Sequence, residues 1–362
     1  MLTPYRLLWL LQSLHLLPAG VAISIALCAG CQSYSSPELP DALSPRLVIR
    51  TPQGNAPSRE RDQASSSGQL AKNGLWARLG HDAALWNQVE GSDRVDEQLK
   101  WLIENRSFLT RASGSATPYL HFIVQSLEQR GLPPELALLP MIESAYNPTA
   151  VSHRNAVGLW QFMPATATDS GLRRTASYDG RRDVMASTTA AMDYLQRLYT
   201  VFDGDWLLAL AAYNAGEGTV GRAMDTNRRK GLPTDYWHLQ LPRETAEYVP
   251  RLLALSAVMN APEAHGISLR PVLDEPYFAQ VRLSRPVDLK QVANASGIPE
   301  RVLRQLNPAY LQGTTQGGPG HLLVPVAMQQ PVMATLDASP DDPEVSEILL
   351  KRTAIAVTQI QP

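Results

Sequence analysis

Apolar residues recur three or four positions apart along the middle of this chain, which is the spacing of helices that bury one face. Val95, Leu99 and Leu102 show the pattern, and residues 192–202 repeat it. Gly, Pro and Asn separate such segments, and no series of alternating strands lies between them. The pattern predicts a helical domain over residues 75–265 in which the apolar stripes form the core.

After Pro271 the pattern changes to short apolar runs, in "YFAQVRLSRP", "DLKQVANASGIPERVLRQLNPAYL" and "HLLVPV". This order predicts a strand, two short helices separated by "GIP", and a closing strand, which would form a compact βααβ unit. The unit resembles a LysM module, a carbohydrate-binding unit, but it lacks the Gly-Asp-Thr-Leu stretch that usually opens such a module. We therefore expect it either to bind glycan or to be a structural cap on the helical domain.

A long apolar stretch near the N-terminus, "LLWLLQSLHLLPAGVAISIALCAG", follows Arg6 and ends at Cys31. Its charged, apolar and small-residue regions are those of a secretory signal, although its length would also allow a membrane-spanning helix. The ending "LCAGC" resembles a bacterial lipobox, with Cys28 in the place where leucine is usual. We expect residues 1–30 to be removed and Cys31 to be lipidated.

Gln32 follows the cysteine where an inner-membrane retention aspartate would sit in the lipoproteins that this ending resembles. The resemblance therefore implies an outer membrane lipoprotein that faces the periplasm. Loss of Cys28 with the signal would leave no thiol for a disulfide, so packing alone would stabilise the mature protein. Residues 31–74 are rich in Ser, Pro and Gln and predict a flexible tether, and residues 331–362 predict a mostly flexible tail.

Charge and composition exclude two classes of partner. The chain has 34 acidic and 32 basic residues, a net charge of −2, so it has no basic footprint for nucleic acid. Its seven histidines are scattered, without an H-x-x-x-H pair or a cysteine companion at zinc spacing. We predict no metal, no cofactor and no nucleic acid partner.

Glu143 ends an apolar run in "LPMIESAYNP", where a carboxylate either turns to solvent or is kept for a purpose. Three further stretches follow it: "AVGLWQFMPATA" at 156–167, "LALAAYNAGEGTV" at 208–220 and "RETAEYVPRLLA" at 243–254. In this order and at these spacings they resemble the motifs of the lytic transglycosylases of the soluble-lytic-transglycosylase and goose-lysozyme type. Within that family the likeness is closest to the membrane-bound group D, and it covers roughly residues 75–330.

Cleavage of a β-1,4 glycosidic bond needs a carboxylic acid that protonates the bridging oxygen and still holds its proton near neutral pH. The apolar neighbours Leu139, Met141 and Ile142 would raise the pKa of Glu143, which fits this role. Most glycosidases also use a second carboxylate. Spacing alone leaves six candidates for it: Asp169, Asp179, Asp183, Glu217, Glu244 and Glu247.

The resemblance implies a different mechanism, in which one glutamate serves as acid and then as base. After protonating the leaving oxygen, Glu143 would take the proton from the C6 hydroxyl of the same muramic acid. That hydroxyl would attack C1 with assistance from the N-acetyl group, so that no water is consumed and a 1,6-anhydro ring forms. An intramolecular attack of this kind gains a high effective concentration and needs no protein nucleophile.

The resemblance also implies the residues that contact the glycan. Gln161 and Met163 would line the sugar groove, the first by hydrogen bonds and the second by contact with a sugar face. Tyr213 and Asn214 would contact the N-acetyl and hydroxyl groups around the reacting sugar, and Tyr248 would place its hydroxyl close to the acid. Taken one at a time, such tyrosines are more often core residues with a satisfied hydroxyl, so the prediction depends on their joint occurrence.

Three neighbouring residues have two interpretations each. Ser144 would hydrogen-bond near the acid or the substrate, or it is simply a hydroxyl at a helix end. Gly158 would allow a close backbone approach, or it marks a plain turn. Trp160 is expected in the core rather than in the groove.

We predict a mainly α protein with a lysozyme-like helical catalytic domain and a small α+β, degenerate LysM-like C-terminal unit. The expected function is a peptidoglycan lytic transglycosylase whose partners are peptidoglycan glycan strands and, through the lipid, the outer membrane. A hydrolytic muramidase of the same fold and an inactive peptidoglycan-binding lipoprotein are the alternatives. The predicted ranges are a signal peptide at 1–30, a tether at 31–74, a helical extension at 75–117, the catalytic domain at 118–266, the LysM-like unit at 270–330 and the tail at 331–362.

Overall fold

Helix α11 (Arg243–Asn260) is the helix against which much of the helical domain packs. Its residues Val249, Leu252 and Leu253 are completely buried, and α2, α3, α9 and the short α6 lie against it. This helix lies within the predicted helical domain over residues 75–265 and near its C-terminal end. This helix also contributes Tyr248 to the candidate site.

Pro250 lies inside α11, where a proline removes one helical hydrogen bond. The missing donor would have served the carbonyl of Ala246, four residues earlier. The hydroxyl of Tyr236 donates to that carbonyl instead, at 2.9 Å. Tyr236 is completely buried, so the broken helical bond is replaced within the core and α11 continues through the proline.

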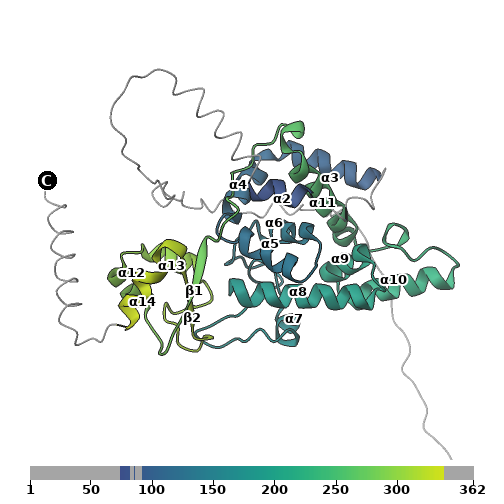
Figure 1. Ribbon diagram of the computed structural model, residues 1–362. Coiled ribbons are helices and arrows are strands. Elements are labelled where there is room, and N and C mark those ends of the chain that lie inside the picture. Colours follow the sequence, from purple (N-terminus) through teal and green to yellow (C-terminus); the bar gives the residue numbers. More distant parts are fainter. Residues whose placement is uncertain (1–73, 82–84, 86–91, 338–362) are drawn as a thin grey trace, which may run out of the picture. The chain divides into compact units, whose positions relative to one another are not determined.

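The computed structural model describes residues 74–81, 85 and 92–337, and the predicted signal and all but the last residue of the predicted tether lie outside this part of the chain (Figure 1). The mainly helical class is confirmed. Besides α11, the helical domain contains α2 (Leu75–His81), α3 (Asp93–Glu104), α4 (Arg106–Ala116), α5 (Leu120–Gln129), α6 (Leu139–Ser144), α7 (Pro164–Asp169), α8 (Val184–Val201), α9 (Trp206–Ala215) and α10 (Glu217–Arg229), with 3-10 turns at Pro134–Leu138, Tyr236–His238 and Pro262–His265.

Two α-helices of the helical domain begin at aspartate caps. Asp183 accepts a hydrogen bond from the Ala186 amide at the start of α8, and Asp205 accepts from the Leu207 and Leu208 amides at the start of α9. These bonds satisfy amides that a helix leaves unpaired at its N-terminus. Helix α9 is apolar over most of its circumference because it is buried between α8, α10 and α11, and it ends at Gly216 with a φ of 84°.

The C-terminal unit has the predicted βααβ order. Strand β1 (Phe278–Arg282) pairs antiparallel with β2 (His321–Pro325), with Val281 opposite Leu322. Helices α12 (Leu289–Ser296) and α13 (Glu300–Leu306) connect the strands, and Gly297 between them has a φ of 78°. The two predicted short helices and two strands are thus confirmed.

The predicted flexible tail is corrected over its first residues. Helix α14 (Gln329–Asp337) continues the unit and packs against α12 and β1 (Figure 1). Val332 is completely buried and Leu336 packs against the core, which gives this segment the apolar anchors that a tail lacks. Residues 338–362 lie outside the described part.

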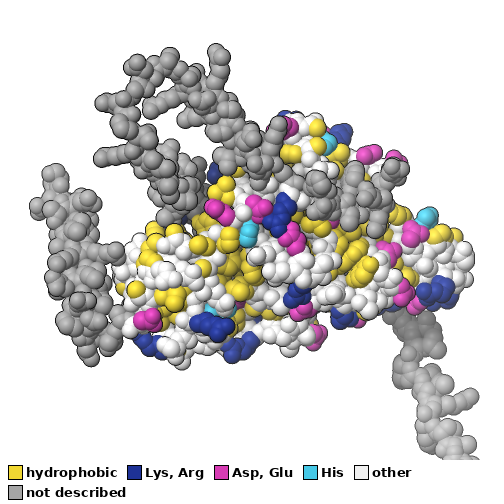
Figure 2. Space-filling model, viewed as in Figure 1, with side chains coloured by type: hydrophobic (Ala, Val, Ile, Leu, Met, Phe, Trp, Pro, Cys, Tyr) yellow, Lys and Arg dark blue, Asp and Glu magenta, His cyan; other side chains and the backbone are white. Residues whose placement is uncertain are grey.

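Within the described ranges, no helix combines the length and the apolar character needed to cross a membrane. On the face shown in Figure 2, acidic and basic side chains are interspersed, in keeping with the nearly balanced charge of the chain. That distribution gives no continuous basic surface on this face.

Candidate active site

Glu143 lies in the last turn of α6, at a helix end with an unusual backbone. Ala145 and Tyr146, which follow the helix, have φ values of 50° and 58°, in the left-handed region that non-glycine residues seldom adopt. Their amides donate to the carbonyls of Met141 and Pro140, at 3.1 and 3.0 Å, and so close the helix. The Tyr146 ring is buried, and its hydroxyl donates to the Ala137 carbonyl, so packing holds this backbone in place.

The carboxyl of Glu143 accepts a hydrogen bond of 2.6 Å from the hydroxyl of Tyr248. Burial raises the pKa of Glu143 from 4.5 to about 7, against the hydrogen bond from Tyr248, which lowers it. The negative charge of Glu244 raises this pKa further. Taken as a whole, the residue is partly exposed, although its carboxyl is buried enough to raise its pKa.

Tyr213 and Tyr248 flank this carboxyl as neutral phenols. Burial, followed by the charge of Glu143, raises the pKa of both tyrosines well above 10. Tyr248 is used as a donor to Glu143, whereas the Tyr213 hydroxyl donates to the Trp160 carbonyl at 2.8 Å. The hydrogen bond from Tyr248 to Glu143 is the one expected from the sequence. The hydrogen bond from Tyr213 connects α9 to the 158–162 loop.

The hydroxyl of Ser144 makes a similar connection. It donates to the carbonyl of Leu159 at 2.9 Å and also lies 3.1 Å from the carbonyl of Pro140 within its own helix. The group is thus a hydroxyl at a helix end, as one interpretation held, and it also fastens α6 to the neighbouring loop, while a hydrogen bond to the substrate stays a prediction. A serine whose hydrogen is shared by two carbonyls has little left to donate to a ligand.

Gly158 allows a close backbone approach, as one of its two interpretations predicted, but the approaching group belongs to the protein. Its φ is 90°, and a Cβ at this position would lie 1.9 Å from the carbonyl oxygen of Arg181. Gln161 has a φ of 49°, and its side-chain amide donates to the Gly158 carbonyl at 2.8 Å. Contact with the Arg181 backbone therefore holds the loop from outside, and the hydrogen bond from Gln161 to Gly158 holds it from within.

Met163 and Trp160 lie in different environments. Met163, at the start of α7, is 41% exposed, as expected for a residue that lines a groove. Trp160 is completely buried and its indole donates to the Thr188 hydroxyl at 3.0 Å, which confirms its place in the core.

The motif at 243–254 contains a further residue, Thr245, for which the sequence predicted no role. Its buried hydroxyl donates to the side-chain oxygen of Asn214 at 2.8 Å, which fixes the orientation of the amide. The signal for it was its place three residues before Tyr248 on the same helix, since residues at that spacing share a face.

The two buried aspartates among the second-carboxylate candidates have other partners. Asp179 accepts two hydrogen bonds from the guanidinium of Arg181, at 3.0 and 2.7 Å. Asp183 caps α8 and accepts from the Tyr178 hydroxyl at 2.9 Å. Burial raises the pKa of both carboxyls, but Arg181 holds the pKa of Asp179 below its usual value, and His321, together with the Ala186 amide and Tyr178, does the same for Asp183.

The other four candidates are less deeply buried: Asp169, Glu217 and Glu244 are exposed, and Glu247 is partly exposed. Glu217 pairs with Arg197 at 2.6 Å, and Glu247 pairs with Arg243 at 2.7 Å. Asp169 is exposed at the end of α7. Glu244 is also exposed, and it acts on Glu143 through its charge. Glu143 therefore combines a hydrogen bond from a tyrosine with a raised pKa, whereas the tyrosine-bonded Asp183 has a lowered pKa.

Comparison with known proteins agrees with this site. The family model described as Transglycosylase SLT domain matches residues 121–234, which include α6 to α10. A second model, Lytic transglycosylase MltD, LysM-like domain, matches residues 277–341. The LysM-like character of the C-terminal unit is thereby confirmed, and the match extends beyond the predicted end at 330 to include α14.

Among curated proteins, the chain is 39% identical over 310 residues to the membrane-bound lytic murein transglycosylase D of Escherichia coli strain K12, covering 84% of this chain and 67% of that protein. It is 49% identical over 121 residues to a putative tributyltin chloride resistance protein of Alteromonas sp. strain M-1, covering 33% of this chain and 58% of that protein. Among solved structures, the 70 kDa soluble lytic transglycosylase of Escherichia coli matches 59% of this chain and 38% of its own at 21% identity, with a TM-score of 0.36. The long alignment with the first of these relatives, together with the two matched family models, shows that the chain belongs to the lytic transglycosylase family.

Proposed function

We propose that this lytic transglycosylase acts on peptidoglycan, where it cleaves the β-1,4 bond between N-acetylmuramic acid and N-acetylglucosamine and leaves a 1,6-anhydromuramic acid end. The observation that carries the proposal is the buried, tyrosine-bonded carboxyl of Glu143, whose pKa is raised to about 7. The name of the Escherichia coli relative, which specifies murein, supports the choice of substrate.

In the first step, Glu143 donates its proton to the glycosidic oxygen as the bond to C1 breaks. A sugar alkoxide is a poor leaving group, so this proton transfer lowers the barrier directly. With a pKa of about 7, roughly half of the molecules carry the proton at neutral pH. An ordinary glutamate would hold almost none.

In the second step, the carboxylate left on Glu143 removes the proton from the C6 hydroxyl of the muramic acid, and that oxygen bonds to C1. The proton count is then restored, and the acid is ready for another cycle. The hydroxyl of Tyr248 stabilises the carboxylate between the two steps, because a donated hydrogen bond favours the charged form. The attacking oxygen belongs to the substrate, so no second protein carboxylate is required.

We assign the neighbouring groups to substrate binding. The exposed Met163 would contact a sugar face, and the amide of Asn214, oriented by Thr245, would hydrogen-bond a substituent of the reacting sugar. Tyr213, Ser144 and Gln161 would act mainly by holding the loop and helix end that form the groove, since their side chains donate to backbone carbonyls. This shifts three predicted binding residues towards a supporting role.

We further propose that the protein is attached to the outer membrane by a lipid on Cys31 and faces the periplasm. The "LCAGC" ending and Gln32 support this location, as does the membrane-bound character named for the Escherichia coli relative. A tether at 31–74 would then give the catalytic domain its reach towards the wall.

Product analysis tests the chemistry. Purified sacculi are digested with the protein, and the muropeptides are separated and weighed by mass spectrometry. We expect anhydro ends, which are lighter by one water than the reducing ends that a muramidase makes. Reducing ends as the main product would favour the hydrolytic alternative, and sacculi that are bound but not cut would favour the inactive binding protein.

A further inference from the structure

The segment at 173–183, which connects α7 to α8, packs along the LysM-like unit. The Asp179 amide donates to the Ala309 carbonyl at 3.0 Å, and the Leu311 amide donates to the Ser177 carbonyl at 2.9 Å. Between these bonds the rings of Tyr178 and Tyr310 lie against each other, 5.7 Å apart at their centres. The segment is thus paired with the unit through backbone and side chains together.

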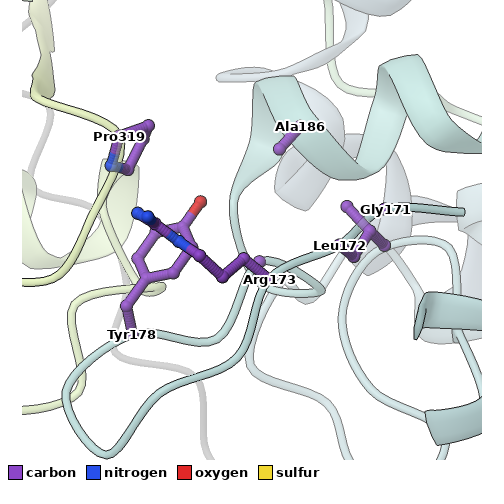
Figure 3. A pocket seen from close by; sticks show the side chains of 7 residues that line it. Gly171, Leu172, Arg173, Tyr178, Ala186 and Pro319 are labelled. Carbon is purple, nitrogen blue, oxygen red and sulfur yellow. The ribbon is translucent and has the colours of Figure 1, made fainter.

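Side chains extend this contact. Asp183 is 4% exposed, and its carboxylate accepts from Tyr178 at 2.9 Å and lies 3.4 Å from Nε2 of His321, which comes from strand β2. Arg173 lies beside the Tyr178 ring and reaches towards the turn that contains Pro319, as Figure 3 shows, and its guanidinium donates to the Gly317 carbonyl at 2.8 Å. Separation of the unit would break these hydrogen bonds and expose the buried rings of Tyr178 and Tyr310, which is costly.

The other end of the 173–183 segment touches the active-site loop, which comprises residues 157–162. The carbonyl of Arg181 lies where a side chain on Gly158 would be, so the two backbones are in direct contact. The guanidinium of Arg181 donates to the Asn155 carbonyl at 2.9 Å and is itself held by Asp179. A continuous set of contacts therefore runs from strand β2 through Asp183 and Arg181 to the loop that borders Glu143.

We infer that the LysM-like unit positions the active-site loop through the 173–183 segment, with Asp183, Tyr178 and His321 as positioning residues for the reaction. The unit is then an integral part of the catalytic scaffold, and any binding of glycan by it is additional. The loop carries the carbonyls that Ser144 and Tyr213 hold, so a shift of the loop would move both ends of the site. A displacement of about 1 Å in such a site can cost up to ~100-fold in rate.

The test uses the full-length protein with His321→Ala, His321→Gln and a matched control, His238→Ala. His238 also pairs with an aspartate, Asp235, at 2.8 Å, but at an exposed position. Amide hydrogen exchange of residues 157–162 is followed by mass spectrometry, and kcat and KM are measured on short soluble glycan fragments that are too small to bridge to a separate binding module. Melting temperatures are recorded for every variant.

We expect His321→Ala to speed exchange in residues 157–162 and to lower kcat about 10-fold while KM on short fragments changes little. His321→Gln, which keeps a nitrogen donor near Asp183, should recover most of both losses, and His238→Ala should resemble the parent protein. If His321→Ala does not fold, Tyr178→Phe replaces it, because this change removes a single hydroxyl and keeps the ring contact with Tyr310.

The opposite pattern would overturn the inference: unchanged exchange at 157–162 and unchanged kcat, with weaker binding to sacculi, would identify an independent binding module. The inference rests on the proposed function only for its rate measurement. If the parent protein cleaves no glycan, the proposed function fails, and the exchange experiment still decides whether the unit holds the loop.

Discussion

Tyr248 and Glu143 are 105 positions apart in the sequence, and their side chains meet in a hydrogen bond of 2.6 Å. Burial of the glutamate favours its protonated form, and the tyrosine favours its charged form, with a resulting pKa of about 7. One residue pair thus sets the protonation of the group on which both proposed steps depend.

Glu143→Gln should fold and bind glycan but fail to cut it, because an amide cannot exchange the proton. We expect kcat to fall by ~10⁴-fold, at the upper end of the range for a general acid, since the leaving group is poor. Turnover is measured on sacculi, and folding by circular dichroism.

Glu217→Gln, Glu244→Gln and Glu247→Gln are the matched controls for that change, and each should cost much less. If any of the three abolishes turnover as fully as Glu143→Gln in a folded protein, a two-carboxylate hydrolase becomes the better description.

The rate should depend on pH through the protonation of Glu143. Because the proton donor must be protonated, kcat/KM should decline as the pH rises through about 7. Tyr248→Phe removes the hydrogen bond that lowers this pKa, so the decline should move to higher pH even as the maximal rate falls. Glu244→Gln removes a negative charge that raises the pKa and should move the decline to lower pH. Shifts in the reverse directions would show that another group controls the profile.

The stability of the folded protein should also depend on the protonation of Glu143, and it should fall as the pH rises. A glutamate whose folded pKa is raised from 4.5 to about 7 leaves stability unaffected below pH 4.5 and reduces it progressively until the pH exceeds about 7. The full cost is about 3 kcal/mol, at 1.36 kcal/mol for each pH unit. Glu143→Gln should therefore raise the melting temperature much more at pH 8 than at pH 4.5.

The exposed Glu217→Gln provides the comparison in this experiment, and it should show no such gain at pH 8. If Glu143→Gln and Glu217→Gln changed the melting temperature by the same amount at each pH, burial of Glu143 would not be the cause of the lower stability at pH 8.

Gly158→Ala should disrupt the site through the backbone. A methyl group there would lie 1.9 Å from the Arg181 carbonyl, so the loop or the 173–183 segment must move. Gly131→Ala is the control, because Gly131 also has a positive φ, 64°, but has open space around it. The control should lose about 1–2 kcal/mol of unfolding free energy, and Gly158→Ala should lose a further ~1–3 kcal/mol together with most activity. Equal losses in urea unfolding would argue against the close packing.

Cys31→Ala should release the protein from membranes or stall its processing, because the lipid would have no attachment site. Fractionation of cell envelopes with an antibody to the protein measures the outcome. Cys28→Ala is the control, since this residue would leave with the signal, and the anchored fraction should not change. A Cys31→Ala protein that remains with the outer membrane would place the anchor elsewhere.

The sequence predicted the site and the fold best where residue types and their spacing point to the same structure. Glu143 and Tyr248 could be predicted to meet because the family likeness brings their motifs together, and the βααβ order followed from local pattern alone. The partner of Gly158 could not be predicted, because contact with Arg181 depends on how a later loop folds back. Helix α14 was missed because its apolar anchors, Val332 and Leu336, are few and their burial depends on packing against other parts of the unit such as α12 and β1.

Pro250 has a consequence for anyone who wishes to make this enzyme more heat-stable. Replacing a proline inside a helix by alanine is an obvious choice, because it restores an amide donor to the helix. Here the Ala246 carbonyl already has a partner in Tyr236, and the restored amide would compete with that buried hydroxyl. The displaced phenol would be left with its longer hydrogen bond to the Thr245 carbonyl, at 3.2 Å, three residues along the helix from Tyr248. The proline and the tyrosine are best exchanged together or left alone.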